Sequence, residues 1–280
     1  RAWKDGFVIE VIVVDNASRD GSAQMVEKEF GEAILIKSKK NLGFSAGNNL
    51  GLPKAKGEYV LFLNPDTVVS PETLREMLKF MQQNPEVGAA TCRVELPNGR
   101  LDEASHRGFP TPWRAFCYFL GLAKFFPRSR FFAGYTLGYL PLDRIHEIDS
   151  GTGAFLLVRR KAGQQIACLP GRQGWWDEDY FWYGDDLDFC YRLKEKGWKI
   201  MFVPITKILH YRGVASGIKK HTQEISTATQ KTRRRATRAS IEAMRIFYKK
   251  HYLSKYPRLI TWVTLLGINL LGKIRLAKVG

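Results

Sequence analysis

Two near-continuous apolar runs in the first part of the chain each lead into an acidic side chain. Phe7–Val14 is followed directly by Asp15, and Tyr59–Leu63 is followed shortly by Asp66. Runs this apolar are typical of strands that are covered on both faces. Polar groups just past the carboxyl ends of such strands lie where open α/β sheets bind ligands. The pattern therefore restricts the chain to an α/β fold with a polar site along one edge of its sheet.

Strand and helix patterns alternate along most of the chain. The strands that we predict lie at Phe7–Val14, Ala33–Lys37, Glu58–Leu63, Gly88–Val94, Ile148–Arg159 and Trp198–Val203. The predicted helices follow Gly21, occupy 46–55, begin at Ser70-Pro71 with a capping serine, and run over 186–196 to Gly197. This alternation predicts a mainly parallel sheet sandwiched by helices.

The middle of the sequence changes character. His106–Ile148 is rich in Phe, Tyr, Gly and Pro and has no long periodic run. Connections of this length without their own periodicity are usually functional or disordered, so we expect a long mobile region over the site.

Most of the positive charge lies in the last quarter of the chain. The whole chain carries a net charge of +17, and residues 212–280 hold 16 Lys+Arg against 2 Asp+Glu. This asymmetry indicates an anionic surface as a partner, either nucleic acid or lipid headgroups. Glu224–Tyr252 is predicted to be helical. Leu259–Leu271 would span about 20 Å, less than the ~30 Å hydrocarbon core, which favours an interfacial or packed helix over a membrane span.

The four cysteines are scattered without metal-type pairing, and no secretory pattern precedes the first strand. Both observations favour a reduced, cytoplasmic compartment with buried thiols. The first residue is Arg1, so we expect that the chain begins inside a longer gene product.

Tyr183–Asp188 places three carboxylates at the start of an amphipathic helix, and His210 follows further along. One carboxylate, most easily Asp188, can cap the helix. Another, Asp186, is then free to act as a general base for an acceptor hydroxyl. Carboxylates with a histidine also suit a divalent cation that is completed by substrate phosphates.

Each of these motifs has a structural alternative. Asp66 lies in Asn-Pro-Asp-Thr, which is also good turn chemistry, and Asp15 with Asn16 also forms a typical Asx turn. The aromatic stretch Trp175–Tyr183 suits sugar rings, a membrane rim or ordinary core packing. Lys231–Arg238 suits phosphates or a solvated helix face. The Gly- and Asn-rich stretch 41–51 allows close backbone approach but matches neither the Walker nor the Rossmann pattern.

Five stretches together resemble glycosyltransferase family 2, the inverting enzymes of the Rossmann-related GT-A fold, and within it the rhamnosyltransferase-like group. They are VIVVDNASRDGS, NLGFSAGNNLGL, YVLFLNPDT, GTGAFLLVRR and YGDDLDFCYRLKEKGWKI. They occur in the family's order and spacing from about Glu10 to Gly213.

The resemblance implies a nucleotide-sugar donor and a divalent cation, Mg²⁺ or Mn²⁺. Asp66 and His210 match the metal ligands, with Asn64 replacing the first acid of the family's Asp-x-Asp motif. Asp186 matches the catalytic base and Asp185 its acidic neighbour. The substrate-binding residues that we predict are Asp15, Asn16, Asn41, Gly43, Asn49, Asn64, Gly151 and Trp182.

We therefore expect a glycosyltransferase catalytic domain over residues 1–213 and a basic, partly apolar helical extension over 214–280. The domain looks N-terminally incomplete, because family members carry a strand and a helix before the strand matched by Phe7–Val14. The expected reaction is metal-dependent, inverting sugar transfer to a cell-surface glycan or lipid-linked acceptor at the cytoplasmic face of an anionic membrane. No nucleic-acid partner is expected. A nucleic-acid-binding protein and an inactive remnant of the same fold are the alternatives.

Overall fold

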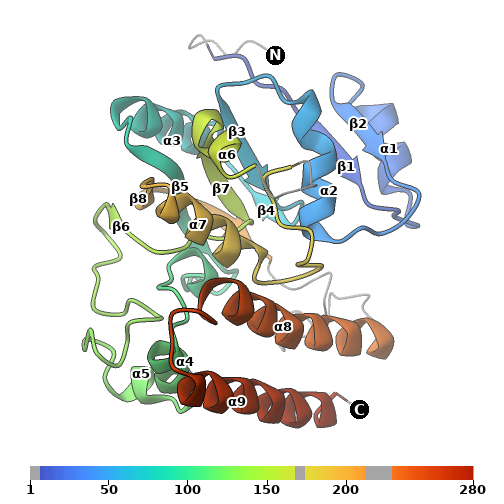
Figure 1. Cartoon of the computed structure of the whole chain (residues 1–280). Coiled ribbons are helices and arrows are strands. Elements are labelled where there is room, and N and C mark those ends of the chain that lie inside the picture. Colours follow the sequence, from blue (N-terminus) through green and yellow to red (C-terminus); the bar gives the residue numbers. More distant parts are fainter. Residues whose placement is uncertain (1–6, 168–173, 212–228, 280) are drawn as a thin grey trace.

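The computed structural model describes residues 7–167, 174–211 and 229–279, and its strands form two sheets (Figure 1). β1 and β2 pair with each other, and the larger sheet has the order β3-β7-β5-β8-β4, with β6 added beside β8. The strands are β1 (Ile12–Asp15), β2 (Ile34–Lys37), β3 (Tyr59–Leu63), β4 (Thr67–Val68), β5 (Val87–Glu95), β6 (His146–Glu147), β7 (Phe155–Arg159) and β8 (Lys199–His210).

Helices surround these strands and also form a separate layer at the C-terminal end of the chain (Figure 1). They are α1 (Ser22–Glu29), α2 (Phe44–Gly51), α3 (Pro71–Gln83), α4 (Pro112–Phe119), α5 (Leu122–Phe125), α6 (Arg160–Gln165), α7 (Asp185–Glu195), α8 (Gln230–His251) and α9 (Arg258–Ala277), with 3₁₀ turns η1 (Leu52–Lys54) and η2 (Glu103–Ser105). The predicted start of α3 is confirmed, because the Ser70 hydroxyl accepts a hydrogen bond from the Thr73 amide.

The α/β class is as predicted, but the expectation of a mainly parallel sheet needs correction. β1–β2 and β5–β8 are parallel, whereas β7 runs antiparallel to both β3 and β5, and β4 and β6 run antiparallel to β8. The long connection after β5 explains the direction of β7. Arg107 bridges Ser150 in that connection, so the chain returns to the same end of the sheet that it left. A strand that starts there must run backwards.

The region predicted to be long and mobile contains two short helices and strand β6. α4 begins with Thr111, whose hydroxyl accepts a hydrogen bond from the Arg114 amide, and with Pro112 at the first helical position. Asp149 fixes the region, because its carboxylate accepts hydrogen bonds from the Phe109 amide and the Arg114 guanidinium. Helices of only one or two turns leave no long periodic pattern, which is why the sequence does not reveal them.

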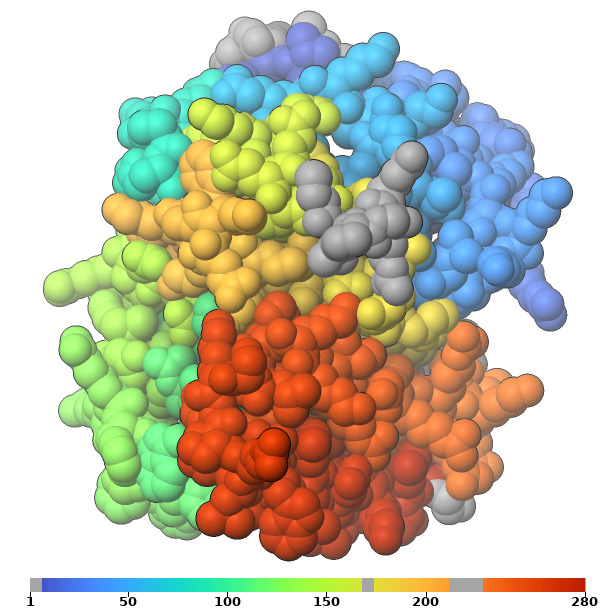
Figure 2. Space-filling view, viewed as in Figure 1, coloured from blue at the N-terminus to red at the C-terminus, as the bar shows by residue number. Residues whose placement is uncertain are grey.

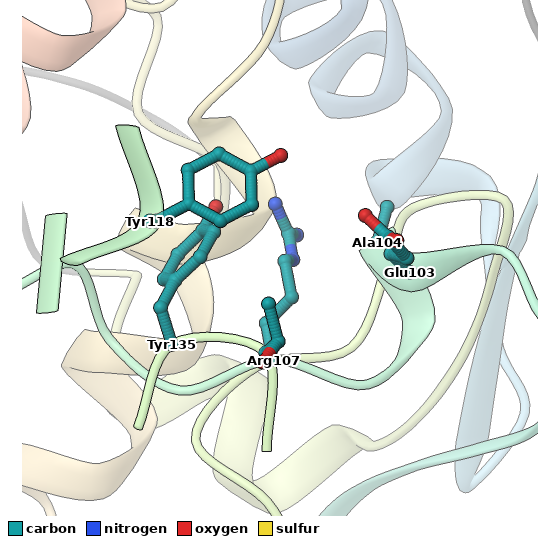
Figure 3. Close-up of a pocket in the computed structure, with 6 residues that line it drawn as sticks. Glu103, Ala104, Arg107, Tyr118 and Tyr135 are labelled. Atoms are coloured by element: carbon teal, nitrogen blue, oxygen red, sulfur yellow. The ribbon is translucent and has the colours of Figure 1, made fainter. Parts of the chain in front are cut away.

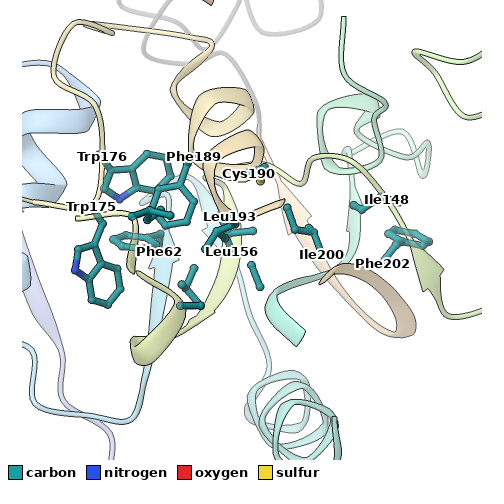
Figure 4. Close-up of a cluster of buried hydrophobic side chains, with 14 of the residues drawn as sticks. Phe62, Ile148, Leu156, Trp175, Trp176, Phe189, Cys190, Leu193, Ile200 and Phe202 are labelled. Carbon is teal, nitrogen blue, oxygen red and sulfur yellow. The ribbon is translucent and has the colours of Figure 1, made fainter. Parts of the chain in front are cut away.

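Both faces of the larger sheet are buried. Alternate residues of β7 point to opposite sides: Leu156 and Val158 pack under α6 and α7, and Phe155 and Leu157 pack under α3. This alternation explains why the sequence of β7 is apolar throughout. The cluster beneath α7 is rich in aromatic rings, with Trp176 tilted over Phe189 (Figure 4).

The C-terminal helices α8 and α9 form an antiparallel pair. Gly272 of α9 lies where a Cβ atom would come within 3.1 Å of the Ile241 side chain, so a small residue allows close contact. α9 has 20 residues, about 30 Å at 1.5 Å per residue, so it is longer than the predicted 13-residue segment. Of the helices in the described residues, α9 alone is long and apolar enough to cross a membrane.

The C-terminal pair packs on the rest of the chain. Phe247 and Tyr248 of α8 share a buried cluster with Tyr180, Leu187 and Tyr191. The predicted helix start at residue 224 and the predicted domain boundary at 213–214 lie outside the described residues.

Leu193→Ala is expected to destabilise the fold by about 2–5 kcal/mol. Leu193 lies on the inner face of α7 and is fully buried, so its truncation leaves a cavity. Leu253→Ala, at an exposed position, is the matched control and should change stability by less than about 0.5 kcal/mol. Urea denaturation followed by circular dichroism measures both. Equal effects of the two substitutions would contradict the position of this core.

Candidate active site

The predicted base lies at the start of α7, where the backbone turns sharply. Tyr183 and Gly184 both have positive φ, 71° and 75°, a conformation that is costly for the tyrosine. This turn brings Asp185 and Asp186 into the first helical turn. One Asp186 oxygen accepts a hydrogen bond from Arg107 Nη2 at 2.7 Å, and the other accepts one from the Leu187 amide at 2.8 Å.

Asp188 does not cap α7, contrary to the prediction. Gly184 is the N-cap residue, and it has no side chain to offer a hydrogen bond. The Asp188 carboxylate is buried and instead accepts hydrogen bonds from Arg192 at 2.7 Å and His251 at 2.8 Å. Burial acts to raise the pKa of Asp188, but these two partners outweigh burial and hold it below its usual value. Asp188 therefore joins α7 to α8.

Asp66 and His210 lie next to each other at the end of the larger sheet. Thr67 of β4 pairs with His210 of β8, and His210 Nε2 lies 3.3 Å from Asp66 Oδ1. The other ring nitrogen, Nδ1, lies 3.0 Å from Oδ2 of Asp102, which is fully buried. The imidazole is thus held between two carboxylates.

The pKa of His210 reflects this arrangement. Burial disfavours the charged imidazolium, but the hydrogen bonds and negative charges of Asp102 and Asp66 outweigh that effect and raise the pKa to about 9. With a pKa of about 9 and no cation bound, the His210 ring is protonated at neutral pH and pairs with both carboxylates.

One short segment joins the His210 cluster to the predicted base. Asp102 contacts His210, and Arg107, five residues later, contacts both Asp186 and the Gly151 carbonyl. Five residues span at most ~18 Å even when fully extended, and η2 shortens this segment further. The predicted metal-binding pair and the predicted base therefore border the same few residues.

A small cavity opens on this segment. Its volume is about 60 Å³. In Figure 3 the Arg107 side chain rises between the rings of Tyr118 and Tyr135 on one side and Glu103 and Ala104 on the other. Arg107 therefore faces this cavity while its guanidinium also bonds the predicted base.

The loop before α2 is tied to the end of β1. The Asn16 side chain donates to the Gly43 carbonyl at 2.9 Å and accepts from the Leu42 amide at 2.8 Å, and Asn41 accepts from the Gly43 amide. Gly43 has φ +86°, and a Cβ atom there would come within 2.4 Å of the Phe181 carbonyl. The side chains of Asn16 and Asn41 therefore fix the conformation of this loop. The loop also packs against Phe181, in the segment that leads into α7.

Other predicted substrate-binding residues also have protein partners. The Asn49 side-chain amide bonds the Trp176 backbone and Glu178. The Asp15 carboxylate accepts a hydrogen bond from the Ser18 amide, three residues further on.

Asn64, Gly151 and Trp182 differ in what they offer a ligand. The Asn64 carbonyl accepts a hydrogen bond from the Thr67 hydroxyl, Gly151 is buried beside Arg107, and the Trp182 ring stacks on Tyr183. Substrate contact by all eight of these residues stays a prediction.

Two residues with a direct place in the site, Asp102 and Arg107, were missed in the sequence. Both lie in Asp-Glu-Ala-Ser-His-Arg-Gly, at the edge of the region predicted to be mobile. An Asp, a His and an Arg shortly after the predicted strand Gly88–Val94 were the signal that could have identified them. Polar residues past the end of a strand are also the reason for which Asp66 was selected.

The donor set fits a divalent cation that is shared with a substrate. Among the residues that the structure describes, no group of three or more His, Cys, Asp or Glu side chains is arranged around a common metal position. Asp66 and His210 supply one carboxylate and one imidazole, and the Asp66 side chain is partly exposed. Magnesium typically takes one or two carboxylates and completes its shell with water and substrate phosphates. Asp66 and His210 supply only two ligands, so the other coordination positions would be open to water and phosphate.

The α/β fold agrees with the GT-A-like fold that the sequence resemblance implied. The family model described as "Glycosyl transferase family 2" matches residues 3–140. N-acetylglucosaminyl-diphospho-decaprenol L-rhamnosyltransferase of Mycobacterium tuberculosis is 28% identical over 221 residues, which is 75% of this chain and 68% of that protein. Rhamnosyltransferase WbbL of Escherichia coli is 26% identical over 60% of this chain and 61% of its own length. Residues 3–140 are thus similar to glycosyltransferase family 2, and most of the chain is similar to rhamnosyltransferases.

Among solved structures, GalNAc-T7 with UDP, GalNAc and Mn²⁺ aligns with a TM-score of 0.49 and 13% identity, covering 72% of this chain and 37% of that one.

Asp185→Asn is expected to remove a pH dependence of stability. Burial first, and then repulsion by Asp186, raises the pKa of Asp185 to about 8. A raised folded-state pKa means that the stabilising contribution is complete below about pH 4 and is lost as the pH rises through about 8. The asparagine cannot ionise, so Asp185→Asn should gain stability relative to the parent at pH 9 but not at pH 4.

Urea denaturation at these two pH values measures the effect. Asp143→Asn, on an exposed turn, is the control and should follow the parent at both. Parallel pH profiles for Asp185→Asn and the parent would contradict the raised pKa.

Proposed function

We propose that the protein transfers a sugar from a nucleoside-diphosphate donor to an acceptor hydroxyl in one step, with inversion at the anomeric carbon. The observation that carries this proposal is the joining of Asp186 and the Asp66–His210 pair through residues 102–107. A base and a site for a leaving diphosphate must lie near each other in such a reaction. The match of residues 3–140 to glycosyltransferase family 2 supports the same chemistry.

Asp186 is the proposed base. It takes the proton from the acceptor hydroxyl as the oxygen bonds to the anomeric carbon, and the bond to the donor diphosphate breaks on the opposite face. Arg107 keeps the Asp186 side chain in one orientation through its 2.7 Å hydrogen bond. Asp185, buried next to Asp186, is protonated at neutral pH because its pKa is raised, so it adds little competing charge.

Asp66 and His210 would hold the divalent cation, Mg²⁺ or Mn²⁺. When bound, the ion offsets the charge that develops on the departing diphosphate. Asp102 fixes the His210 ring through Nδ1, so that Nε2 points toward Asp66. Histidine ligands usually bond such an outer carboxylate, which sets the tautomer and the ring orientation.

The proposed acceptor is a lipid-linked glycan at the cytoplasmic face of an anionic membrane. The name of the M. tuberculosis relative includes a lipid-linked sugar, N-acetylglucosaminyl-diphospho-decaprenol. The basic charge of residues 212–280 favours an anionic surface. A sugar-linked lipid and a peripheral, cytoplasmic enzyme are consistent with both features.

Asp186→Asn is expected to lower the transfer rate by about 10²–10⁴-fold, because an amide cannot accept the hydroxyl proton. The donor KM should stay close to that of the parent, since the substitution keeps the shape and the bond from Arg107. Transfer from labelled nucleoside-diphosphate sugars to a lipid-linked acceptor, assayed with the full-length gene product, measures both constants. Asp143→Asn, on an exposed turn, is the control. Addition of EDTA should stop transfer in all forms. Unchanged transfer by Asp186→Asn would remove Asp186 from this role.

Asp102→Ala is expected to weaken Mn²⁺ binding by about 10–100-fold, because His210 loses the partner that orients its ring. Isothermal titration with Mn²⁺ and a nucleoside diphosphate reads this out without turnover. Asp102→Asn, which retains a hydrogen-bonding oxygen, should lose less affinity. Equal Mn²⁺ affinity in the alanine variant and the parent would contradict the role of Asp102.

A further inference from the structure

Two segments far apart in the sequence expose apolar side chains on one end of the molecule. The first is residues 112–131, which contain α4 and α5, and the second is α9. We propose that they form a single membrane-docking face that rests on the surface of an anionic lipid bilayer. Hereafter the docking face means the exposed apolar and basic side chains of residues 112–131 and of α9.

Residues 112–131 combine exposed aromatic rings with positive charge. Phe125 is 78% exposed and Phe131 62% exposed. The exposed apolar side chains in this segment are Trp113, Phe116, Phe119, Leu120, Phe125, Phe126 and Phe131. The segment also carries four basic residues, Arg114, Lys124, Arg128 and Arg130, and no acidic residue. Aromatic rings beside Lys and Arg are typical of segments at a membrane interface.

α9 adds a regular apolar stripe. Its exposed apolar side chains recur every three or four residues, so they occupy one face along the whole helix. The stripe consists of Leu259, Trp262, Val263, Leu266, Leu270 and Ile274, and Ile260 is exposed beside it. The opposite side, where Gly272 meets Ile241, packs on α8. The apolar stripe of α9 therefore faces away from the protein.

The two segments are neighbours in the structure. The Arg275 guanidinium of α9 lies over the Phe119 ring of α4, 5.6 Å from its centre. In Figure 1, α4 and α5 lie beside α9 at the end of the molecule away from α1. Figure 2 shows the same end as a continuous surface of the green middle segment and the red C-terminal helices. Exposed apolar patches of this extent mark interaction sites in soluble domains.

Charge and helix packing favour a bilayer surface over a span. α8, directly behind α9, carries eight Lys and Arg against one acidic residue, which suits anionic headgroups. α9 is also bound to α8 by hydrogen bonds between Arg245 and Asn269 and between Tyr248 and Thr261. A spanning α9 would have to break these bonds or bring the cations of α8 into hydrocarbon. α9 therefore lies along the bilayer surface.

The docking face is coupled to the site through α4. Tyr118 of α4 lines the small cavity that Arg107 enters, and Arg107 bonds Asp186. Docking through α4–α5 and α9 would therefore bring this cavity close to the bilayer. Use of the cavity by a lipid-linked acceptor rests on the proposed function, whereas docking itself does not.

Vesicle sedimentation of the full-length protein tests the docking face. The parent should bind vesicles of phosphatidylcholine with phosphatidylglycerol and bind phosphatidylcholine alone at least about tenfold more weakly. The double variants Leu120→Ser/Phe125→Ser and Trp262→Ser/Leu266→Ser should each bind anionic vesicles about tenfold or more weakly than the parent. The matched control is Met25→Ser/Phe30→Ser, which removes exposed apolar side chains on α1 and at its end, away from the docking face. It should bind within about twofold of the parent.

Circular dichroism and thermal melts establish that each variant is folded, and a variant that fails this test is replaced by Phe125→Ser or Trp262→Ser alone. Equal binding to neutral and anionic vesicles, or unchanged binding in both double variants, would overturn the proposal. A dimer in sedimentation velocity that the same variants dissociate would also overturn it, because a second copy would then cover the face. Bound protein that withstands about 1 M salt would indicate a spanning α9 and contradict surface docking.

A transfer assay separates this proposal from the proposed function. Docking variants should keep the parent rate toward a water-soluble acceptor analogue and lose rate only toward an acceptor embedded in vesicles. Vesicle binding with no transfer to either acceptor would contradict the proposed function and leave the docking face supported.

Discussion

Two hydrogen bonds of residues 102–107, one between the His210 ring and the Asp102 carboxylate and one from Arg107 to Asp186, hold the candidate site in place. All four side chains are buried or nearly so. A charged group removed from water is costly unless it is paired and hydrogen-bonded. Movement of this segment would leave several buried charges without partners. Asp186 and the Asp66–His210 pair therefore keep a fixed position relative to each other.

The sequence predicts those parts of the fold that have a local cause. Continuous apolar runs locate β1 and β3, and Ser70-Pro71 locates the start of α3. The reverse direction of β7 has no local cause, because it depends on where a long connection returns. Asp102 and Arg107 escape prediction for a similar reason. Their importance lies in contacts with residues about 80 to 110 positions away.

The asparagines near β1 and α2 illustrate a second limit of sequence patterns. The resemblance to a family motif predicts that Asn16 and Asn49 bind substrate, but it does not reveal their partners within the protein. In the structure, each amide bonds backbone groups of a distant loop. An unpaired buried amide is expensive, so these bonds stabilise the loop positions strongly. A motif around a ligand site thus contains residues that hold the surrounding loops in position as well as residues that contact the ligand.

The buried bond between Asp188 and His251 has a consequence for the smallest piece of this enzyme that can fold. Asp188 lies two residues from the proposed base, and its partner His251 is contributed by the last turn of α8. A shortened chain that stops before α8 would leave this carboxylate with Arg192 alone and would uncover Tyr191 and Leu187. The minimal autonomous unit therefore extends through α8, and trimming at the end of the last strand would yield an insoluble product rather than a compact domain.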